Sequence, residues 1–268
     1  MGSYPERRWL PVYDITKLVS QKVFTKLLKL LPTPRQKREG RRRSGKEALL
    51  NGILQVLVNG VAWNKIAHCG CSYASCWRYF QELQRRGKLK LIYDSLAWER
   101  TDITEGAIDT TTATSFRFER MIGWDGHHKK VGTKISIFSD KVGLPADILF
   151  GSGDKPDPDF VEEHWQNTAG RRRKILNLDK LYVSLERRRK WRNRGTKINM
   201  QMKTNDYKRK RGPKFSFDAL KYQVRFLVER LNSWLKNFRS VRIRRSYHPA
   251  MFKAFVYLAL IIILIRYS

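Results

Sequence analysis

Cysteine, acidic residues and long apolar runs are all scarce in this chain of 268 residues, and each scarcity excludes a class of protein. Three cysteines cannot supply the disulfide framework of a small secreted domain, so we expect a reducing compartment. The one long apolar run, Ala254–Ile265, is too short to span a bilayer and is typical of a buried helix. Met1–Pro11 is polar and charged, which predicts no signal peptide.

The scarcity of acidic residues points to an anionic partner. Only 24 Asp and Glu oppose 55 Lys and Arg, which gives a net charge of +31, and a folded chain with that charge repels itself unless an anion neutralises it. Nucleic acid is the predicted partner, because its phosphates release counterions when basic side chains bind them. An anionic membrane surface is the rival, but no basic amphipathic segment dominates. The basic residues cluster in Lys37–Arg43, Arg171–Lys174, Arg187–Arg194, Lys208–Lys214 and Arg239–Arg245.

The cysteines lie close together in the sequence and raise the question of a zinc site. His68, Cys69, Cys71 and Cys76 all offer zinc-binding atoms. Their spacing is not that of a known zinc finger or ribbon, and the chain does not separate them into two halves of a site. We therefore predict free cysteines rather than a metal centre.

Glycine and proline divide residues 1–100 into short helices. The chain as a whole has a hydrophobic content of 41%, which is sufficient for a packed core. Ser44 is the expected N-cap of one helix, because Glu47 three residues later completes a capping box. Ser72 is the expected N-cap of another. The predicted helices cover residues 15–31, 44–60, a short stretch from residue 63, 73–84 and 89–98.

A helix, a short helix and a third helix in this order are typical of a helix-turn-helix module. In such a module the N-terminal residues of the last helix lie near base edges in the major groove. A small helical bundle without a role in DNA binding is the alternative, and the basic run before the module favours DNA binding. Candidate DNA contacts on the last helix are Ser72, Tyr73, Ser75, Arg78 and Gln81.

The pattern changes to alternating and β-branched residues near residue 101. Three strands, a helix, a strand, a helix, a strand and two final helices predict a mixed sheet with helices on both faces. This is the order of an RNase H-like α/β domain. We therefore predict two domains, an all-α helix-turn-helix-like domain at residues 1–100 and an RNase H-like catalytic domain at residues 101–268. The predicted elements are strands 106–115, 133–138, 144–150, 174–179 and 197–203, and helices 159–166, 184–193, 222–236 and 249–265.

Three carboxylates occupy positions that converge in an RNase H-like fold: Asp109 on the first strand, Asp179 at the end of the fourth, and Glu229 on the helix after the last strand. Aspartate is disfavoured in strands, and a buried carboxylate without a partner is costly. Clustered carboxylates repel unless a cation lies among them, and oxygen ligands suit Mg²⁺ or Mn²⁺. When each residue is considered alone, there is a structural alternative. Asp109 could be an N-cap or turn residue, and Glu229 could lie on a solvent-exposed helix face.

The helix predicted over residues 222–236 places Glu229 among cations. At about 100° per residue, Tyr222, Arg225, Glu229 and Lys236 fall within an arc of roughly 60°. Apolar residues project from the other side, as in a helix that packs on a core. A metal ligand on this helix would therefore have basic side chains beside it.

The spacing Tyr222-x2-Arg225-x3-Glu229-x6-Lys236 carries a resemblance to a known family. The chain resembles bacterial insertion-sequence DDE transposases of the group marked by a Tyr-x2-Arg-x3-Glu-x6-Lys signature. The resemblance covers nearly the whole chain. It extends to Ala107–Thr111 and Leu176–Tyr182 around the two aspartates, to Gly132–Ile135, and to Asn51–Leu54 and Gly60–Trp63 in the helical part.

This resemblance implies a DNA transposase that nicks the terminal inverted repeats by hydrolysis and then joins the freed 3′-hydroxyl to target DNA. It implies Asp109, Asp179 and Glu229 as catalytic ligands of two Mg²⁺ ions, for which Mn²⁺ can substitute. It also implies that Tyr222, Arg225 and Lys236 contact phosphates. The implied partners are double-stranded DNA and at least a second copy of the chain, in the cytoplasm at the nucleoid and away from membranes.

One departure from the family pattern bears on activity. Leu181 stands where the group usually has glycine, which would tighten the backbone beside Asp179. A catalytically inactive, transposase-derived DNA-binding or regulatory protein is therefore an alternative function. A nuclease of the same fold that cuts RNA–DNA hybrids is another, but it does not account for the helix-turn-helix pattern.

Overall fold

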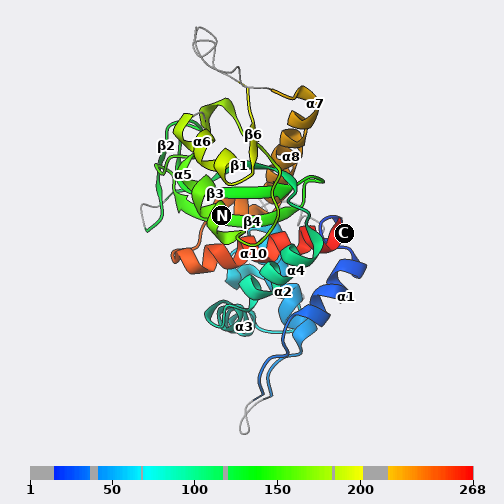
Figure 1. Ribbon diagram of the computed structural model, residues 1–268. Helices are drawn as coiled ribbons and strands as arrows, with labels where there is room; N and C mark the ends of the chain where they lie inside the picture. Colours follow the sequence, from blue (N-terminus) through cyan, green and yellow to red (C-terminus); the bar gives the residue numbers. More distant parts are fainter. Residues whose placement is uncertain are drawn as a thin grey trace, which may run out of the picture.

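The computed structural model describes residues 15–36, 42–67, 69–116, 120–182, 185–201 and 217–267. It places a mixed sheet above a layer of helices, with the last helix of the chain between them (Figure 1). The helical layer contains η1 (Ile15–Lys17), α1 (Gln21–Leu30), α2 (Lys46–Asn59), η2 (Trp63–Lys65), α3 (Tyr73–Arg85) and α4 (Lys88–Arg100).

Two of the predicted helix beginnings are wrong. In each case a local hydrogen bond sets the beginning of the helix at a later residue. The helix predicted over residues 15–31 is divided, because the Ser20 side chain accepts a hydrogen bond from the backbone N–H of Val23 and caps α1 there. Ser44 is not the N-cap of α2. The helix begins one residue later, where the carbonyl of Gly45 accepts from Leu49 N–H, and no side chain caps it.

The other predicted boundaries in this layer agree with the structure to within two residues. Ser72 caps α3 by accepting a hydrogen bond from the backbone N–H of Ser75 at 3.3 Å. Gly60 ends α2 and Gly87 follows α3, both with positive φ, which glycine adopts without a steric cost. The predicted order of helix, short helix and third helix is therefore confirmed. Ser184, the first residue of the helix predicted over residues 184–193, and the histidine His68 lie outside the described residues.

The sheet is built around β1 (Glu105–Ser115), which pairs antiparallel with β3 (Lys130–Asp140) on one side. On the other side β5 (Ile175–Asn177) runs parallel to β1, and β6 (Lys197–Asn199) runs parallel to β5. β4 (Pro145–Ser152) continues the sheet beyond β3. The predicted mixed sheet is therefore confirmed, although β5 and β6 are shorter than predicted.

Several short elements were not predicted, among them β2 (Gly123–Asp125), α9 (Arg239–Arg242) and β7 (Ile243–Arg244). β2 pairs with β3 inside the segment expected to be a loop. In the basic segment before the last helix, α9 is followed by β7, which runs parallel to the end of β1. Elements of two to four residues are held by pairing and packing with distant segments, so local sequence patterns predict them poorly.

Helices cover both faces of the sheet, as predicted. Successive side chains of a strand point to opposite faces. Ala107, Ile135 and Ile137 belong to the core shared with the helical layer, whereas Ile108 and Phe138 belong to a second core under α5 (Asp159–Asn167) and α6 (Leu185–Asn193). α5 and α6 lie on the side of the sheet away from the last helix (Figure 1).

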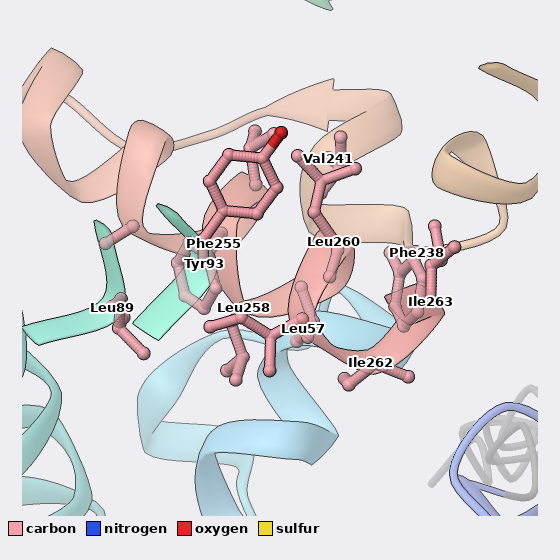
Figure 2. Close-up of a cluster of buried hydrophobic side chains, with 14 of the residues drawn as sticks. Leu57, Leu89, Tyr93, Phe238, Val241, Phe255, Leu258, Leu260, Ile262 and Ile263 are labelled. Atoms are coloured by element: carbon pink, nitrogen blue, oxygen red, sulfur yellow. The ribbon is translucent and has the colours of Figure 1, made fainter. Parts of the chain in front are cut away.

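The last helix, α10 (Pro249–Arg266), is the centre of the larger core. It contacts α1, α3, α4, β4 and α8 (Val224–Lys236), and Figure 2 shows its side chains meeting Leu57 of α2 and Tyr93 of α4. Within the described chain it is the one helix whose length and composition would suit a membrane span, and 72% of that 18-residue stretch is buried inside the protein. It is therefore the buried helix that its apolar run predicts, and it joins the helical layer to the sheet.

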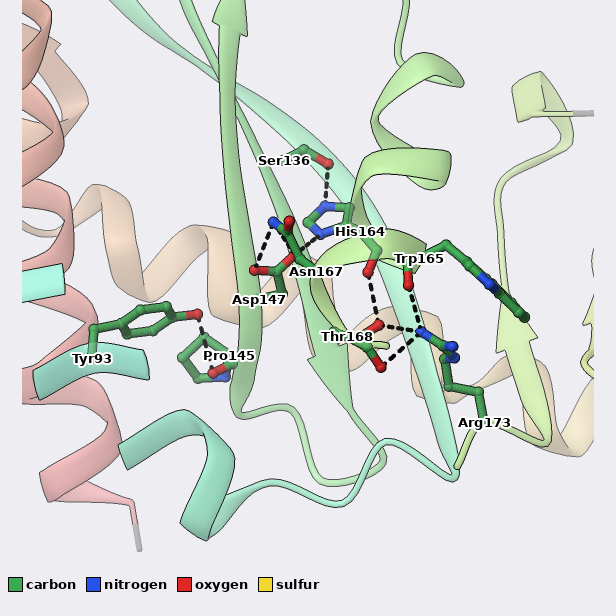
Figure 3. A network of polar contacts seen from close by, with 9 residues as sticks. All are labelled: Tyr93, Ser136, Pro145, Asp147, His164, Trp165, Asn167, Thr168 and Arg173. Atoms are coloured by element: carbon green, nitrogen blue, oxygen red, sulfur yellow. Dashed lines mark hydrogen bonds and ion pairs between the residues drawn. The ribbon is translucent and has the colours of Figure 1, made fainter. Parts of the chain in front are cut away.

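A polar network fixes the segment that leads into β5 (Figure 3). His164 of α5 is fully buried, with Nδ1 2.7 Å from Asp147 Oδ2 of β4 and Nε2 2.9 Å from Ser136 Oγ of β3. Arg173, two residues before β5, donates to the carbonyls of Trp165 and Thr168. Part of the basic run Arg171–Lys174 therefore holds the fold together instead of facing a partner.

Candidate active site

Two strands that lie side by side bring the first two carboxylates together. β1 and β5 pair in parallel, with Ala107 level with Asn177. The same register, continued two residues beyond β5, places Asp179 level with Asp109. Neighbouring strands are about 4.8 Å apart, so the two side chains start from adjacent backbone positions.

The backbone beside Asp179 accommodates Leu181 without strain. Residues 180–182 form a 3₁₀ turn, η3 (Lys180–Tyr182), and the backbone N–H of Leu181 donates to Asp179 Oδ1 at 2.9 Å. Among the described residues, the non-glycine positions with positive φ are Met121 and Lys129. Leu181 is not one of them, and its side chain is exposed. The expected tightening of this backbone by the missing glycine is not present.

The third carboxylate comes from α8 (Val224–Lys236), whose apolar side is buried against β1 and β3. Asn232 joins this helix to the sheet, since its side-chain amide donates to Asp109 Oδ2 at 2.8 Å. Glu229 lies three residues before Asn232 and therefore on the same side of the helix. The sequence analysis missed Asn232, although its spacing from Glu229 was a usable signal.

The helix predicted over residues 222–236 is divided at Gln223 into α7 (Ala219–Tyr222) and α8. Gln223 keeps right-handed helical angles, with φ −60° and ψ −24°, so the chain direction changes little. Burial raises the pKa of the Tyr222 hydroxyl and the charge of Arg225 acts to lower it, so the two side chains still lie near each other. The predicted common face of Tyr222, Arg225 and Glu229 therefore survives the break.

One guanidinium group lies among the three carboxylates. Arg225 is one turn before Glu229, and its Nη1 is 2.9 Å from Glu229 Oε1. Its Nη2 is 2.8 Å from Asp179 Oδ2 and 4.0 Å from Asp109 Oδ1. The three acidic residues singled out in the sequence therefore meet within 4.0 Å of a single side chain.

The charges of this cluster depend on one another. Burial raises the pKa of Asp109 to about 6, while Arg225 acts to lower it and Glu229 to raise it. Burial alone would lower the pKa of Arg225, but the negative charge of Asp179 and its neighbours raises it above the ordinary value. Arg225 Nε is buried and finds no hydrogen-bond partner within the described chain. The site thus concentrates negative charge that a cation must balance.

An open pocket of about 160 Å³ lies against Asp109, Asp179 and Arg225, and two histidines that the sequence analysis missed also line it. His127 and His128 follow β2 in the turn to β3, and their backbone N–H groups donate to Asp125 Oδ1 at 3.0 and 3.1 Å. The other oxygen of Asp125 is 2.9 Å from Nδ1 of His128. An aspartate followed at two and three residues by a histidine pair was the available signal.

Lys236 lies on the same side of α8, within a group of cations. Burial lowers its pKa, and so do the charges of Lys130 and Arg242, whereas Asp109 acts in the opposite direction. Lys130 begins β3 and Arg242 ends α9, so three separate elements contribute to this basic group. A cationic surface therefore adjoins the acidic cluster.

The structure does not bring the helix-turn-helix candidates Tyr73 and Arg78 to the acidic cluster. Tyr73 begins α3 and Arg78 follows in its second turn, and both are exposed. α3 lies in the helical layer, on the other side of α10 from the sheet (Figure 1). Any surface that these two residues form is thus separate from the one around Arg225.

Comparison with known proteins identifies the family. A family model described as a transposase of the IS4/5 family matches residues 19–93, and the transposase DDE domain matches residues 92–265. The chain belongs to the DDE transposases. The family in question is that of bacterial insertion sequences, as the resemblance in the sequence implied.

Two further likenesses agree with this assignment. The insertion element IS402 uncharacterized 16.2 kDa protein of Burkholderia cepacia is 30% identical over 116 residues, which span 40% of this chain and 79% of that protein. The cryo-EM structure of a piggyBac transposase synaptic complex with hairpin DNA superposes with a TM-score of 0.53 and 11% identity, over 94% of this chain and 73% of that one. The predicted RNase H-like α/β fold of this transposase is therefore confirmed.

The turn that carries the pocket histidines gives a prediction about stability in acid. Burial alone would raise the pKa of Asp125, but hydrogen bonds from Thr112 and His128 lower it to about 2. Because this is below the unfolded value of about 3.9, the carboxylate stabilises the fold above pH 4 and the effect disappears as the pH falls toward 2. Asp125→Asn is expected to lower the unfolding free energy by about 1–3 kcal/mol at pH 7 and to differ little from wild type near pH 2.

Urea denaturation at the two pH values measures this difference. Asp94→Asn is the matched control, because Asp94 forms an exposed ion pair with Lys90 that contributes little to stability. If Asp125→Asn also lowers the unfolding free energy at low pH, or if Asp94→Asn lowers it equally at pH 7, the charge of Asp125 does not stabilise the turn.

Proposed function

We propose that this transposase cuts DNA at the ends of its insertion sequence and joins the freed 3′-hydroxyl to target DNA. One observation carries the proposal. In a member of the DDE transposase family, carboxylates from β1, from the end of β5 and from α8 lie within 4.0 Å of one guanidinium beside an open pocket. Asp109, Asp179 and Glu229 are the catalytic residues in this proposal.

The residues present fit a pair of hard divalent cations. The three carboxylates offer oxygen atoms, which Mg²⁺ prefers and Mn²⁺ accepts, and their charge already requires a cation between them. Asp109, Asp179 and Glu229 would hold two Mg²⁺ ions. When bound, such ions activate a water or a 3′-hydroxyl and stabilise the leaving oxygen of an in-line phosphoryl transfer.

Arg225 has two roles in this proposal. Without divalent ions, its guanidinium balances the charge of the three carboxylates and keeps them together. With the ions in place, the guanidinium is free to bind a phosphate of the DNA strand, for which its fork of N–H donors is well suited. Tyr222 lies near the Arg225 side chain and would contact the same DNA strand.

The cationic group around Lys236 would bind the DNA backbone next to the cleaved bond. Lys236, Lys130 and Arg242 come from three elements. Burial lowers the pKa of Lys236, and the charges of Lys130 and Arg242 lower it further, an effect that a row of phosphates would relieve. The net charge of +31 supports the same partner. Double-stranded DNA is therefore the proposed substrate, in agreement with the hairpin DNA in the complex of the piggyBac transposase.

The helical layer would recognise the transposon end. Tyr73 and Arg78 are exposed at the beginning of α3, where a recognition helix presents side chains to base edges. We propose residues 1–100 as the DNA-binding part and residues 101–268 as the catalytic part. Since two ends must be joined, at least two copies of the chain would act together, in the cytoplasm at the nucleoid.

The first test concerns the carboxylates. Glu229→Gln, Asp109→Asn and Asp179→Asn are each expected to reduce nicking of end DNA by more than about 100-fold, because each removes a metal ligand. Binding to the same DNA should be retained. The measurement is the rate of Mg²⁺-dependent cleavage together with a filter or mobility-shift binding assay.

Glu99→Gln is the matched control, since Glu99 is an exposed glutamate on α4. Its cleavage rate should equal that of the wild type. Full cleavage by Glu229→Gln, or the absence of cleavage by the wild-type protein with both Mg²⁺ and Mn²⁺, would refute the proposed chemistry. The second outcome would favour the non-cutting regulatory protein.

A second test separates the two roles of Arg225. Arg225→Ala removes the shared cation, so we expect the unfolding free energy in EDTA to fall by about 2 kcal/mol. Adding Mg²⁺ should raise the Tm of this variant more than that of the wild type, because the ion no longer competes with the guanidinium. Cleavage should remain impaired, since a phosphate contact is also lost.

Thermal denaturation across a series of Mg²⁺ concentrations measures the effect. Arg230→Ala removes a cation from the exposed side of the same helix and serves as the control. An equal response of the two variants to Mg²⁺ would mean that Arg225 does not occupy the place of the ions.

A third test concerns α3. Arg78→Ala is expected to weaken binding of end DNA by about 10-fold and to lower the salt dependence of binding by about one phosphate contact. Arg86→Ala changes the net charge equally but removes an arginine already paired with Glu82 at 3.2 Å. Tyr73→Ala should reduce the preference for end DNA over random DNA. If Arg86→Ala weakens binding as much as Arg78→Ala, charge alone explains the effect and α3 is not the recognition helix.

A further inference from the structure

The three cysteines, which the sequence predicts to be independent thiols, lie together in the structure. Cys69 and Cys71 belong to the turn after η2, and Cys76 is in the first turn of α3. The sulfur of Cys71 is 3.8 Å from that of Cys69 and 3.2 Å from that of Cys76. All three sulfur atoms lie within 4.8 Å of one another. The convergence comes from the turn that Ser72 closes as the N-cap of α3.

One of these separations matches the geometry of a shared metal ion, and a second is close to it. Thiolates that bind Zn²⁺ tetrahedrally at about 2.3 Å are about 3.8 Å apart, which is the separation of Cys69 and Cys71. The sulfurs of Cys71 and Cys76 are 3.2 Å apart, within hydrogen-bonding distance of two thiols, and would move slightly apart to share the ion.

The surroundings confine the cluster on one side and leave it open on another. The α-carbon of Gly52 on α2 lies directly against it, since a Cβ atom there would be 2.5 Å from the sulfur of Cys76 and 3.5 Å from that of Cys69. Cys69 and Cys76 are buried, whereas Cys71 is only partly covered. An ion held by the three sulfurs would thus have α2 behind it and solvent in front of Cys71.

We propose that Cys69, Cys71 and Cys76 form a binding site for one soft divalent ion of the Zn²⁺ class, with the fourth coordination position open to water. Thiolate ligands select such ions over Mg²⁺ and Mn²⁺, so the site is chemically distinct from the carboxylate cluster. Each thiol releases its proton to solvent as it binds the ion. The ion would tie the turn after η2 to the first turn of α3 and so fix the beginning of the helix that carries Tyr73 and Arg78.

The test uses the full-length protein, reduced and freed of metal, and Co²⁺ as the probe. We expect one equivalent of Co²⁺ to give the near-ultraviolet charge-transfer absorption of thiolate ligands and visible bands of tetrahedral geometry. Zn²⁺ should displace it. Cys71→Ser, at the partly covered position, should weaken Co²⁺ binding by about 10- to 100-fold and reduce the charge-transfer intensity. Circular dichroism checks that this variant is folded.

Glu229→Gln is the control that separates this site from the carboxylates, and it should leave the charge-transfer absorption unchanged. The proposal fails if Co²⁺ gives no thiolate charge transfer, or if Cys71→Ser leaves the absorption intact. It also fails if mass spectrometry of the reduced protein returned to air finds Cys71 and Cys76 joined by a disulfide while Co²⁺ remains unbound. None of these outcomes depends on whether the protein cleaves DNA.

Discussion

The pairing of β1 with β3 and β5 is the constraint on which the candidate active site depends. The parallel register with β5 sets Asp179 level with Asp109, and the packing of α8 on β1 and β3 supplies Glu229. Asn232 holds the helix to the strand through Asp109. A shift of one residue in that register would turn the side chain beside Asp109 to the other face of the sheet. The site therefore depends on the sheet more than on any single loop.

Charge is the second constraint, because an acidic cluster has to form in a very basic chain. Arg225 reduces the repulsion within the cluster, because its guanidinium lies among the three carboxylates. Other arginines that composition alone would assign to DNA are committed to the fold. Arg173 binds carbonyls of α5 and the turn after it, and the buried Arg244 donates to the carbonyl groups of Arg120 and Met121. The net charge therefore overstates the number of basic side chains that are available to bind nucleic acid.

Much of the fold could be predicted from local patterns, and the failures have a common cause. The long strand around Asp109 and the buried last helix follow from alternation and apolar content. β7 could not be predicted in this way, because its two residues are held by pairing with Thr114 and Ser115, far away in the chain. The division of the first helix at Ser20 and the start of α2 at Gly45 depend on which hydrogen bond is formed, and several candidates were available.

The sequence by itself determined which residues share a helix face and which carboxylates interrupt strands, because periodicity and spacing are local properties. That was enough to single out Asp109, Asp179, Glu229 and their basic neighbours on α8. The tertiary structure alone decided that these carboxylates share Arg225, that His127 and His128 line the same pocket, and that three cysteines meet beside Gly52. Strand register and helix packing set the distances between the side chains in each of these contacts. A local sequence pattern does not contain that information.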